Sequence, residues 1–343
     1  MIRGLIVREG VVERTVERSE VEKAVSDPHA LLWLDLEGID EGEVQWLGRA
    51  FGFHPLALED CLHRNQRPKI EEYEAYVFAV LHAFRSDPLS HPSPSKGRGR
   101  VEELHIFLSH RYLVTVHALP SEPLNRIWER CGKEPELLGH GPSFILHLLS
   151  DAIVDAYFPL LNALGEEIDL LEDAVIRSPT RARLNRLFAL KKDLILFRKM
   201  ISQKREVYNA LSRREYPFID HKTALYFRDI YDHLLRASET IESYRDLLGT
   251  ILEVYLTAIS NQLNDVMKRL TIIATIFMPL SFIVGFFGMN FALIPWGSRV
   301  LFLLTLLALF VLPIGMLVWF AKRGWLKKEM GPGELKPRRR QLY

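Results

Sequence analysis

The sequence predicts an α+β membrane protein: an N-terminal α/β cytoplasmic domain, then a very long stalk helix that continues into the first of two C-terminal transmembrane helices. Three observations predict this fold class. Strand-like and helix-like segments alternate over residues 1–142. Helical periodicity follows, without a proline between positions 217 and 279. Uncharged apolar runs at 270–289 and 300–320 are each long enough to cross a bilayer as a helix.

Composition and charge exclude several classes of function. The chain has 343 residues and a net charge of +1, from 44 basic and 43 acidic residues. This balance gives no reason to expect nucleic acid as a partner. Cys61 and Cys131 provide no disulfide framework and are expected to be thiols in a reducing compartment. The N-terminal segment becomes charged at once, so no secretory signal is expected.

The first domain, 1–142, is expected to be cytoplasmic and α/β. The segments 41–53 and 54–62 have helical patterns, and Pro55 suits the first turn of the second helix. The loop 86–100 is rich in proline, serine and glycine, which favours a turn or loop. The segments expected to form strands are 31–36, 74–84, 101–109 and 111–118.

The second domain, 143–268, is expected to be a helical stalk. Apolar residues recur every three or four positions over 144–176, and Ser-Pro-Thr at 178–180 marks a break. The helix predicted over 181–211 would return antiparallel. After a second break at 215–220, one continuous helix is predicted from about 223 to 288. At 1.5 Å per residue it would be about 100 Å long.

The third domain, 269–322, holds the two spans, and 323–343 form a basic tail. Lys268 and Arg269 precede the first span, whereas Arg299 is the only charged residue of the connecting turn. The basic residues after the second span are Lys322, Arg323, Lys327 and Lys328. The positive-inside rule therefore predicts a multi-pass protein of the cytoplasmic membrane with both termini in the cytoplasm.

Small, polar or thin side chains form a near-heptad seam along the first span. We call these residues the seam: Asn264, Met267, Leu270, Ala274, Met278, Ser281 and Gly285. One interpretation is close helix packing, which small residues allow in membranes. The other is a pore lining. Two spans per chain cannot enclose a channel, so the pore interpretation requires a ring of copies whose seams face a shared axis.

Acidic residues continue the same side of the helix into the cytoplasm. They are Glu239, Glu242, Asp246 and Glu253. A charged helix face is commonly just solvated. In a symmetric ring, however, these carboxylates would form negative collars below the pore and concentrate cations there.

The segment 261–291 resembles the CorA family of magnesium and cobalt transporters. The resemblance rests on Gly288-Met289-Asn290 after the first of two C-terminal spans, together with Met-Pro-Leu at 278–280 and FRDIYDH at 227–233. It implies a funnel-shaped homopentamer that conducts Mg²⁺, and also Co²⁺ or Ni²⁺, inward. It further implies a pore lined by the seam, with its apolar rings as the gate. No enzyme activity and no organic cofactor are implied.

Gly288, Met289 and Asn290 are the predicted selectivity filter. Mg²⁺ gives up its water reluctantly. Five Asn290 amides, with Gly288 carbonyls nearby, would therefore accept hydrogen bonds from the water shell of a hydrated ion. A carboxylate there would bind more tightly, whereas conduction requires that the ion also leaves. The alternative is that Asn290 only caps the helix end.

The resemblance also implies regulation by Mg²⁺ bound between neighbouring cytoplasmic domains. The matching residues are Asp229, in FRDIYDH, and Asp87. Two carboxylates from different subunits would repel each other without the ion, so losing Mg²⁺ would loosen the ring and favour opening. For Asp87, which precedes Pro88, a turn-initiating role is the alternative.

The outer loop departs from the family pattern. Members commonly carry acidic residues after the triplet, whereas 291–299 has no acid and includes Arg299. Weaker electrostatic capture of cations is expected. A related zinc-transporting branch, ZntB, shares the architecture and is associated with proton coupling, so zinc is the alternative substrate.

Two further hypotheses come from other classes of protein. A membrane-anchored enzyme would use His54, His63, His82 or His105, but their spacing matches no known catalytic metal motif. A non-conducting scaffold would tolerate Asn290→Ala, whereas a transporter would not.

Overall fold

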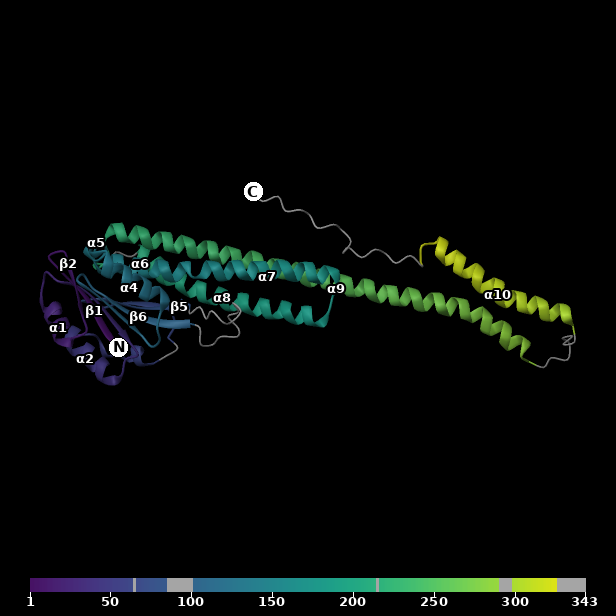
Figure 1. Cartoon of the computed structure of the whole chain (residues 1–343), viewed down its shortest axis with the longest axis horizontal. Coiled ribbons are helices and arrows are strands. Elements are labelled where there is room, and N and C mark those ends of the chain that lie inside the picture. Colours follow the sequence, from purple (N-terminus) through teal and green to yellow (C-terminus); the bar gives the residue numbers. More distant parts are fainter. Residues whose placement is uncertain (64–65, 85–100, 214–215, 290–297, 326–343) are drawn as a thin grey trace. The chain divides into compact units, whose positions relative to one another are not determined.

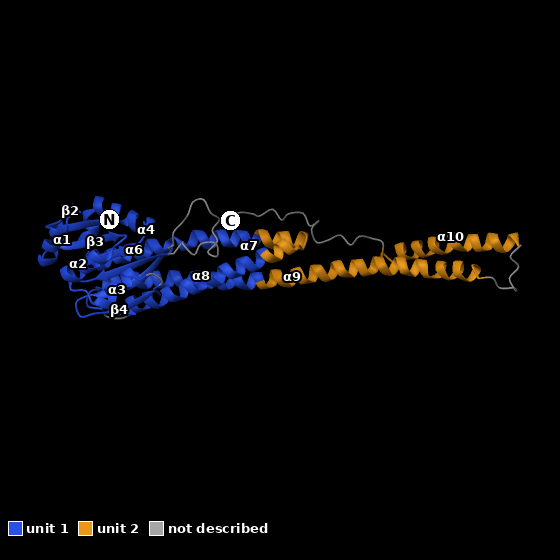
Figure 2. Ribbon diagram, turned by 90° about the horizontal axis from the view of Figure 1, so that it is seen from below, with its two compact units in different colours: residues 1–169, 186–248 blue, residues 170–185, 249–343 orange. Residues whose placement is uncertain are grey.

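The computed structural model describes residues 1–63, 66–84, 101–213, 216–289 and 298–325. The chain divides into two compact units (Figure 2): unit 1 comprises 1–169 and 186–248, and unit 2 comprises 170–185 and 249–343. These units are defined by which parts of the chain pack together, and each combines segments that are separate in the sequence. The domain boundaries expected from the sequence, after residues 142, 268 and 322, remain predictions.

Within the described part of unit 1, seven strands form one mixed sheet in the order β2-β1-β3-β7-β6-β5-β4. Only the central pair β3–β7 is parallel among these neighbours. The strands are β1 (Ile2–Arg8), β2 (Val11–Thr15), β3 (Leu31–Glu37), β4 (Lys69–Glu72), β5 (Val77–Phe84), β6 (Val101–Leu108) and β7 (Tyr112–His117). The four strands expected from the sequence are confirmed as β3, β5, β6 and β7.

Helices cover both faces of this sheet (Figure 1). On β3, Leu32, Leu34 and Leu36 belong to the core shared with α1 (Arg18–Ser26), α2 (Glu41–Phe51) and α3 (Pro55–Leu62). Trp33 points to the other face, because side chains alternate along a strand. There its ring lies 4.9 Å from that of Trp128 in α4 (Glu122–Lys133). The sheet is therefore buried on both sides, which gives the domain a rigid centre.

Local signals explain where elements of this domain begin and turn. Asp40 caps α2, accepting from the Glu43 backbone N–H at 2.8 Å, while the Glu43 side chain accepts from the Asp40 N–H. This reciprocal arrangement satisfies two donors at the helix start. Glu9 and Gly10 both have positive φ, at 50° and 80°. A turn of this kind connects antiparallel strands tightly and joins β1 to β2.

The helical region begins with α5 (Pro135–Gly139) and α6 (Pro142–Asp155) and continues with α7 (Tyr157–Arg177), α8 (Arg181–Arg213) and α9 (His221–Phe287). One helix was expected over 144–176, but the structure interrupts it at Ala156, between α6 and α7. The continuous helix expected from 223 to 288 is confirmed as α9, which runs through Pro279.

In unit 1, α9 buries a heptad stripe. Its fully or nearly buried members are Phe227, Ile230, Leu234, Ala237, Ile241 and Leu248. Alternating steps of three and four residues place these side chains on one side of the helix. The hydrophobic contact that stabilises so long a helix in water is therefore concentrated on a single stripe, and the opposite side is available for other roles.

Three described helical stretches are long and apolar enough to cross a membrane: 142–177, α9 and α10 (Arg299–Lys322). Of the most apolar window in each, 44% is buried within the chain for 142–177, but only 6% for α9 and 0% for α10. The apolar character of 142–177 is thus explained by its burial in the core of the protein. The apolar surfaces of α9 and α10 are exposed, as expected for segments that face lipid or other copies.

Lys204 of α8 is fully buried in unit 1. Its Nζ lies 4.0 Å from the centre of the Tyr157 ring and has no hydrogen-bond partner among the described residues. Burial lowers the pKa of Lys204 well below its ordinary value. Between the lowered pKa of Lys204 in the folded chain and its pKa in the unfolded chain, the unfolded chain binds more protons, so stability should rise with pH up to the unfolded-state pKa.

Replacing Lys204 with Met should stabilise the protein at neutral pH, because folding must either remove the hydration of the Lys204 ammonium or remove its proton, and the Tyr157 ring offsets this cost only partly. We expect Tm of the detergent-solubilised variant to be roughly 2–4 °C higher than that of the unaltered chain at pH 7. The rise of Tm between pH 7 and 9 should be smaller in the variant. Lys191→Met, on an exposed position of α8, is the control. A lower Tm for Lys204→Met would show that the Tyr157 contact outweighs the cost of burial.

Candidate functional site

The seven seam residues are all exposed in unit 2. The contact with α10 is instead made by Ile272 and Ile276 of α9, which form a buried cluster with Phe320 of α10. At about 100° per residue, Ile272 and Ile276 lie on roughly the opposite side of α9 from the seam. The described packing of unit 2 therefore leaves the side of α9 that carries the seam uncovered.

The membrane helix α9 ends in a turn at the predicted filter. The Gly288 N–H donates to the Val284 carbonyl at 2.9 Å, and the Met289 N–H donates to the Phe286 carbonyl at 3.3 Å. A Cβ at Gly288 would lie 3.0 Å from the Val284 oxygen, closer than ordinary contact. Glycine therefore lets the backbone turn tightly where the helix stops. Met289 is exposed, and Asn290 lies outside the described residues.

The predicted cation-attracting acids differ in their surroundings. Glu239, Asp246 and Glu253 are exposed. Glu242 is half-buried, and its carboxylate lies 2.9 Å from Nε of Arg198 and 2.7 Å from a guanidinium nitrogen of Arg245. Its charge is thus partly compensated within the chain. Glu239, Glu242 and Asp246, which belong to unit 1, lie on the side of α9 opposite its buried stripe, as the ring hypothesis requires.

Asp229 lies beside a group of metal-ligating side chains in unit 1. Its Oδ2 is 3.5 Å from Nε2 of His233, one turn further along α9. The ligand atoms of Asp151, Asp155 and His233 all lie within 4.8 Å of one another. Two helices thus bring together side chains about 80 residues apart in sequence.

This group is electrostatically suited to a divalent cation. Partial burial of Asp151, together with the neighbouring Asp155 and Asp229 carboxylates, raises the pKa of Asp151. A divalent ion would relieve this repulsion between carboxylates. Mg²⁺ would use the carboxylate oxygens and keep several waters, whereas Co²⁺, Ni²⁺ or Zn²⁺ would also accept the His233 imidazole.

Asp229 was predicted from the sequence, whereas Asp151, Asp155 and His233 were not. Two features of the sequence could have indicated these residues. Asp151 and Asp155 are four residues apart on one helix, as are Asp229 and His233, and this spacing places side chains on one face. That the two pairs meet depends on how α6 packs against α9. Asp87, the other predicted regulatory ligand, lies outside the described residues.

The histidines considered for an enzyme have structural surroundings. Burial lowers the pKa of both His82 and His105 to about 4, so both are neutral at physiological pH. His82 Nε2 lies 2.9 Å from the Gln66 carbonyl. His54 caps α3 by accepting from the Leu56 N–H at 3.2 Å. These contacts fit strand and helix-cap roles.

Comparison with known proteins agrees with this architecture. The family described as "CorA-like Mg2+ transporter protein" matches residues 28–323. The chain is 38% identical over 322 residues to the "Cobalt/magnesium transport protein CorA" of Thermotoga maritima, covering 91% of this chain and 89% of that protein.

Two solved structures are similar in fold. The CorA magnesium transporter of Methanocaldococcus jannaschii has a TM-score of 0.80 at 22% identity. The match covers 95% of this chain and 99% of that structure. The ZntB cytoplasmic domain of Vibrio parahaemolyticus has a TM-score of 0.60 at 14% identity; the match covers 76% of this chain and 97% of that domain. The family match spans most of the sequence and both membrane helices. The chain is a membrane protein and belongs to the CorA family, a family of transporters rather than enzymes.

Proposed function

We propose that five copies of this chain form a pore that carries divalent cations, chiefly Mg²⁺ and also Co²⁺ or Ni²⁺, into the cytoplasm. The observation that carries the proposal is the exposure of the whole seam on the side of α9 opposite α10. A ring of copies would bring these sides together around one axis, with α10 outside. The protein would lie in the cytoplasmic membrane with both termini in the cytoplasm, as the basic flanks favour.

The seam offers two kinds of surface to an ion. Asn264 and Ser281 provide neutral oxygens that can bind the water shell of a cation. Met267, Leu270 and Met278 provide apolar rings, each more than half exposed in the single chain. A narrow apolar ring can close a channel by excluding water. We assign the gate to these three residues and the filter to Gly288, Met289 and Asn290.

Glu239, Glu242, Asp246 and Glu253 would raise the local concentration of cations below the gate. Carboxylates lining a confined space focus the electrostatic field and attract counter-ions. Arg198 and Arg245 compensate Glu242, and Arg245 also pairs with Asp246 at 3.2 Å. We therefore assign the larger share of this effect to Glu239 and Glu253.

The group around Asp229 is the proposed cytoplasmic regulatory site. Asp151, Asp155 and His233 supply ligands from one chain, and Asp229 lies beside them. Asp87 of a neighbouring copy would complete the site. A bound divalent ion would link adjacent cytoplasmic domains and hold the gate closed, and its loss would release them.

Gly288→Ala tests the tight turn at the filter. A methyl group 3.0 Å from the Val284 oxygen would shift the end of α9 and misplace the filter residues in all five copies. We expect roughly tenfold slower Mg²⁺ uptake, the effect of a change of about 1.4 kcal/mol in the barrier. Gly249→Ala, where an added Cβ meets no atom within 4 Å, should leave uptake unchanged. Equal uptake by both variants would refute a close-packed filter.

A zinc transporter coupled to protons is the alternative. The similarity to the ZntB domain supports it only as a shared fold. The acid-free outer loop favours weaker capture of Mg²⁺, whereas the intact Gly-Met-Asn triplet favours Mg²⁺ or Co²⁺.

Flux into proteoliposomes separates these substrates. Uptake of Mg²⁺, Co²⁺, Ni²⁺ and Zn²⁺ would be compared with and without a pH gradient. We expect Mg²⁺ uptake to follow the membrane potential and to be insensitive to the pH gradient. Uptake of Zn²⁺ alone, driven by a pH gradient, would support the alternative instead.

A further inference from the structure

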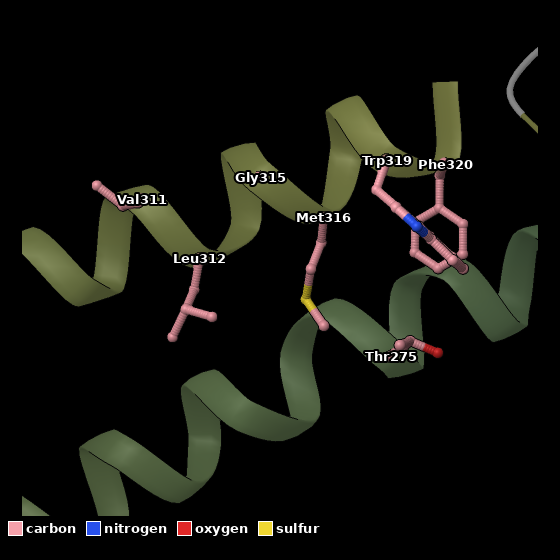
Figure 3. A pocket seen from close by; sticks show the side chains of 7 residues that line it. All are labelled: Thr275, Val311, Leu312, Gly315, Met316, Trp319 and Phe320. Atoms are coloured by element: carbon pink, nitrogen blue, oxygen red, sulfur yellow. The ribbon is translucent and has the colours of Figure 1, made fainter. Parts of the chain in front are cut away.

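An apolar groove runs between the two membrane helices of unit 2. It has a volume of about 570 Å³ and is lined by Thr275 of α9 and by residues of α10 between Val311 and Phe320. Figure 3 shows Leu312 and Met316 extending from α10 towards α9, with the Trp319 and Phe320 rings at one end. At Gly315 an added Cβ would meet no atom within 4 Å. The groove is thus open where α10 lacks a side chain.

A polar cavity of about 370 Å³ follows at the Phe320 end of this groove. Its lining includes Lys268 and Thr271 of α9 and Trp325, which follows α10, and it reaches the seam residues Asn264 and Met267 at its border. Lys268, Thr271 and Thr275 are three to four residues apart, so they lie along one side of α9. Trp325 lies 5.5 Å from Phe320, ring centre to ring centre. The groove and the cavity therefore succeed one another along the same side of α9.

Positive charge gathers at this polar end. The Arg323 guanidinium lies over the Trp319 ring, 5.1 Å from its centre, and Lys268 borders the cavity. The acid that lines the cavity is Asp265, whose Oδ1 is 3.9 Å from the Lys268 Nζ. The cavity itself holds one cation and one carboxylate. Arg323, on the Trp319 ring of the groove, adds a second cation, so this end of the apolar groove has a net positive charge.

We infer that this site binds an anionic phospholipid of the cytoplasmic leaflet. One acyl chain would occupy the groove, and the phosphate would lie between Lys268 and Arg323. The order of the two parts matches a phospholipid, because apolar lining at membrane depth passes into cationic lining at the bilayer surface. The volume of the groove falls within the range of small-molecule sites. The inference requires that α9 and α10 cross the membrane, but not that the chain transports a particular ion.

The competing occupant is a second copy of this chain, whose helix would fill the groove in the assembled protein. A helix would need to match both the apolar groove and the cationic end with a single surface. A lipid supplies an apolar chain and an anionic head in the required order without further fitting. The net positive end is thus the observation that favours the lipid.

Native mass spectrometry of the full chain, with added lipid, tests the site. We expect phosphatidylglycerol to bind roughly tenfold or more tightly than phosphatidylcholine of the same chain length. Lys268→Gln combined with Arg323→Gln should remove this preference. Lys322→Gln, which removes the charge next to Arg323 in sequence but leaves the Arg323 contact with Trp319 intact, is the matched control and should keep this preference. Gly315→Leu should fill the groove and weaken binding of both lipids.

Equal binding of the two lipids by the unaltered chain would overturn the inference. So would a phosphatidylglycerol preference that survives the double substitution. The same spectra report the number of copies in each assembly. If Gly315→Leu reduces that number while lipid binding per chain is unchanged, the groove is an interface between copies and the lipid site is refuted.

Discussion

Asn290→Ala is expected to reduce Mg²⁺ uptake into proteoliposomes to the background of empty vesicles. The physical reason is that a hydrated Mg²⁺ exchanges its water slowly and must be recognised through its water shell. An amide accepts hydrogen bonds from that shell without binding the ion as tightly as a carboxylate would. A methyl group accepts none, and five copies lose the contact together. We expect a loss of at least about a hundredfold, which corresponds to about 2.7 kcal/mol in the barrier.

Two further variants test whether the loss of uptake comes from the Asn290 amide itself. Asn261→Ala removes an amide from α9 at a position outside the seam and should leave uptake unchanged. Asn290→Asp would keep the geometry but add charge, so tighter binding and slower release are expected. If Asn290→Ala conducts like the unaltered chain, Asn290 only caps the helix end, and a non-conducting scaffold or another filter becomes the better explanation.

Asp229→Ala is expected to weaken the protection that Mg²⁺ gives the cytoplasmic domain against protease. Asp229 lies beside Asp151, Asp155 and His233, so its removal takes one negative charge from a proposed divalent site. We expect the Mg²⁺ concentration for half-maximal protection to rise by roughly fivefold or more. Uptake should then persist at cytoplasmic Mg²⁺ concentrations that close the unaltered channel.

Asp232→Ala provides the matched control for this prediction. Asp232 is exposed on the same helix, three residues from Asp229 and outside the ligand group. Its substitution should leave both the protection and the uptake as they were. Unchanged protection in Asp229→Ala, measured alongside this control, would remove Asp229 from regulation.

Much of the fold was predictable because its signals are local. The limits of α9 were predicted to within two residues, since no proline interrupts its periodicity between Pro217 and Pro279. The β1–β2 hairpin was not predicted. Its turn depends on positive φ at Glu9 as well as Gly10, and only glycine signals that conformation strongly. The break at Ala156 was also missed, because apolar spacing continues across it.

The functional residues were predictable from the sequence only where they form a motif or lie along a single helix. The seam and the acids of α9 follow from periodicity along one element. The ligand group of Asp151, Asp155 and His233 arises from packing between α6 and α9, which periodicity does not specify. The lipid groove likewise depends on how α10 packs against Ile272 and Ile276.

The central claim is that several copies of this chain must assemble before an ion pathway exists. The mass of the assembled protein, measured by native mass spectrometry after release from lipid nanodiscs, tests it most directly. With a chain mass of 39.7 kDa, we predict one dominant species that contains five copies. A monomer as the dominant species would contradict the claim, because two membrane helices cannot enclose a pore.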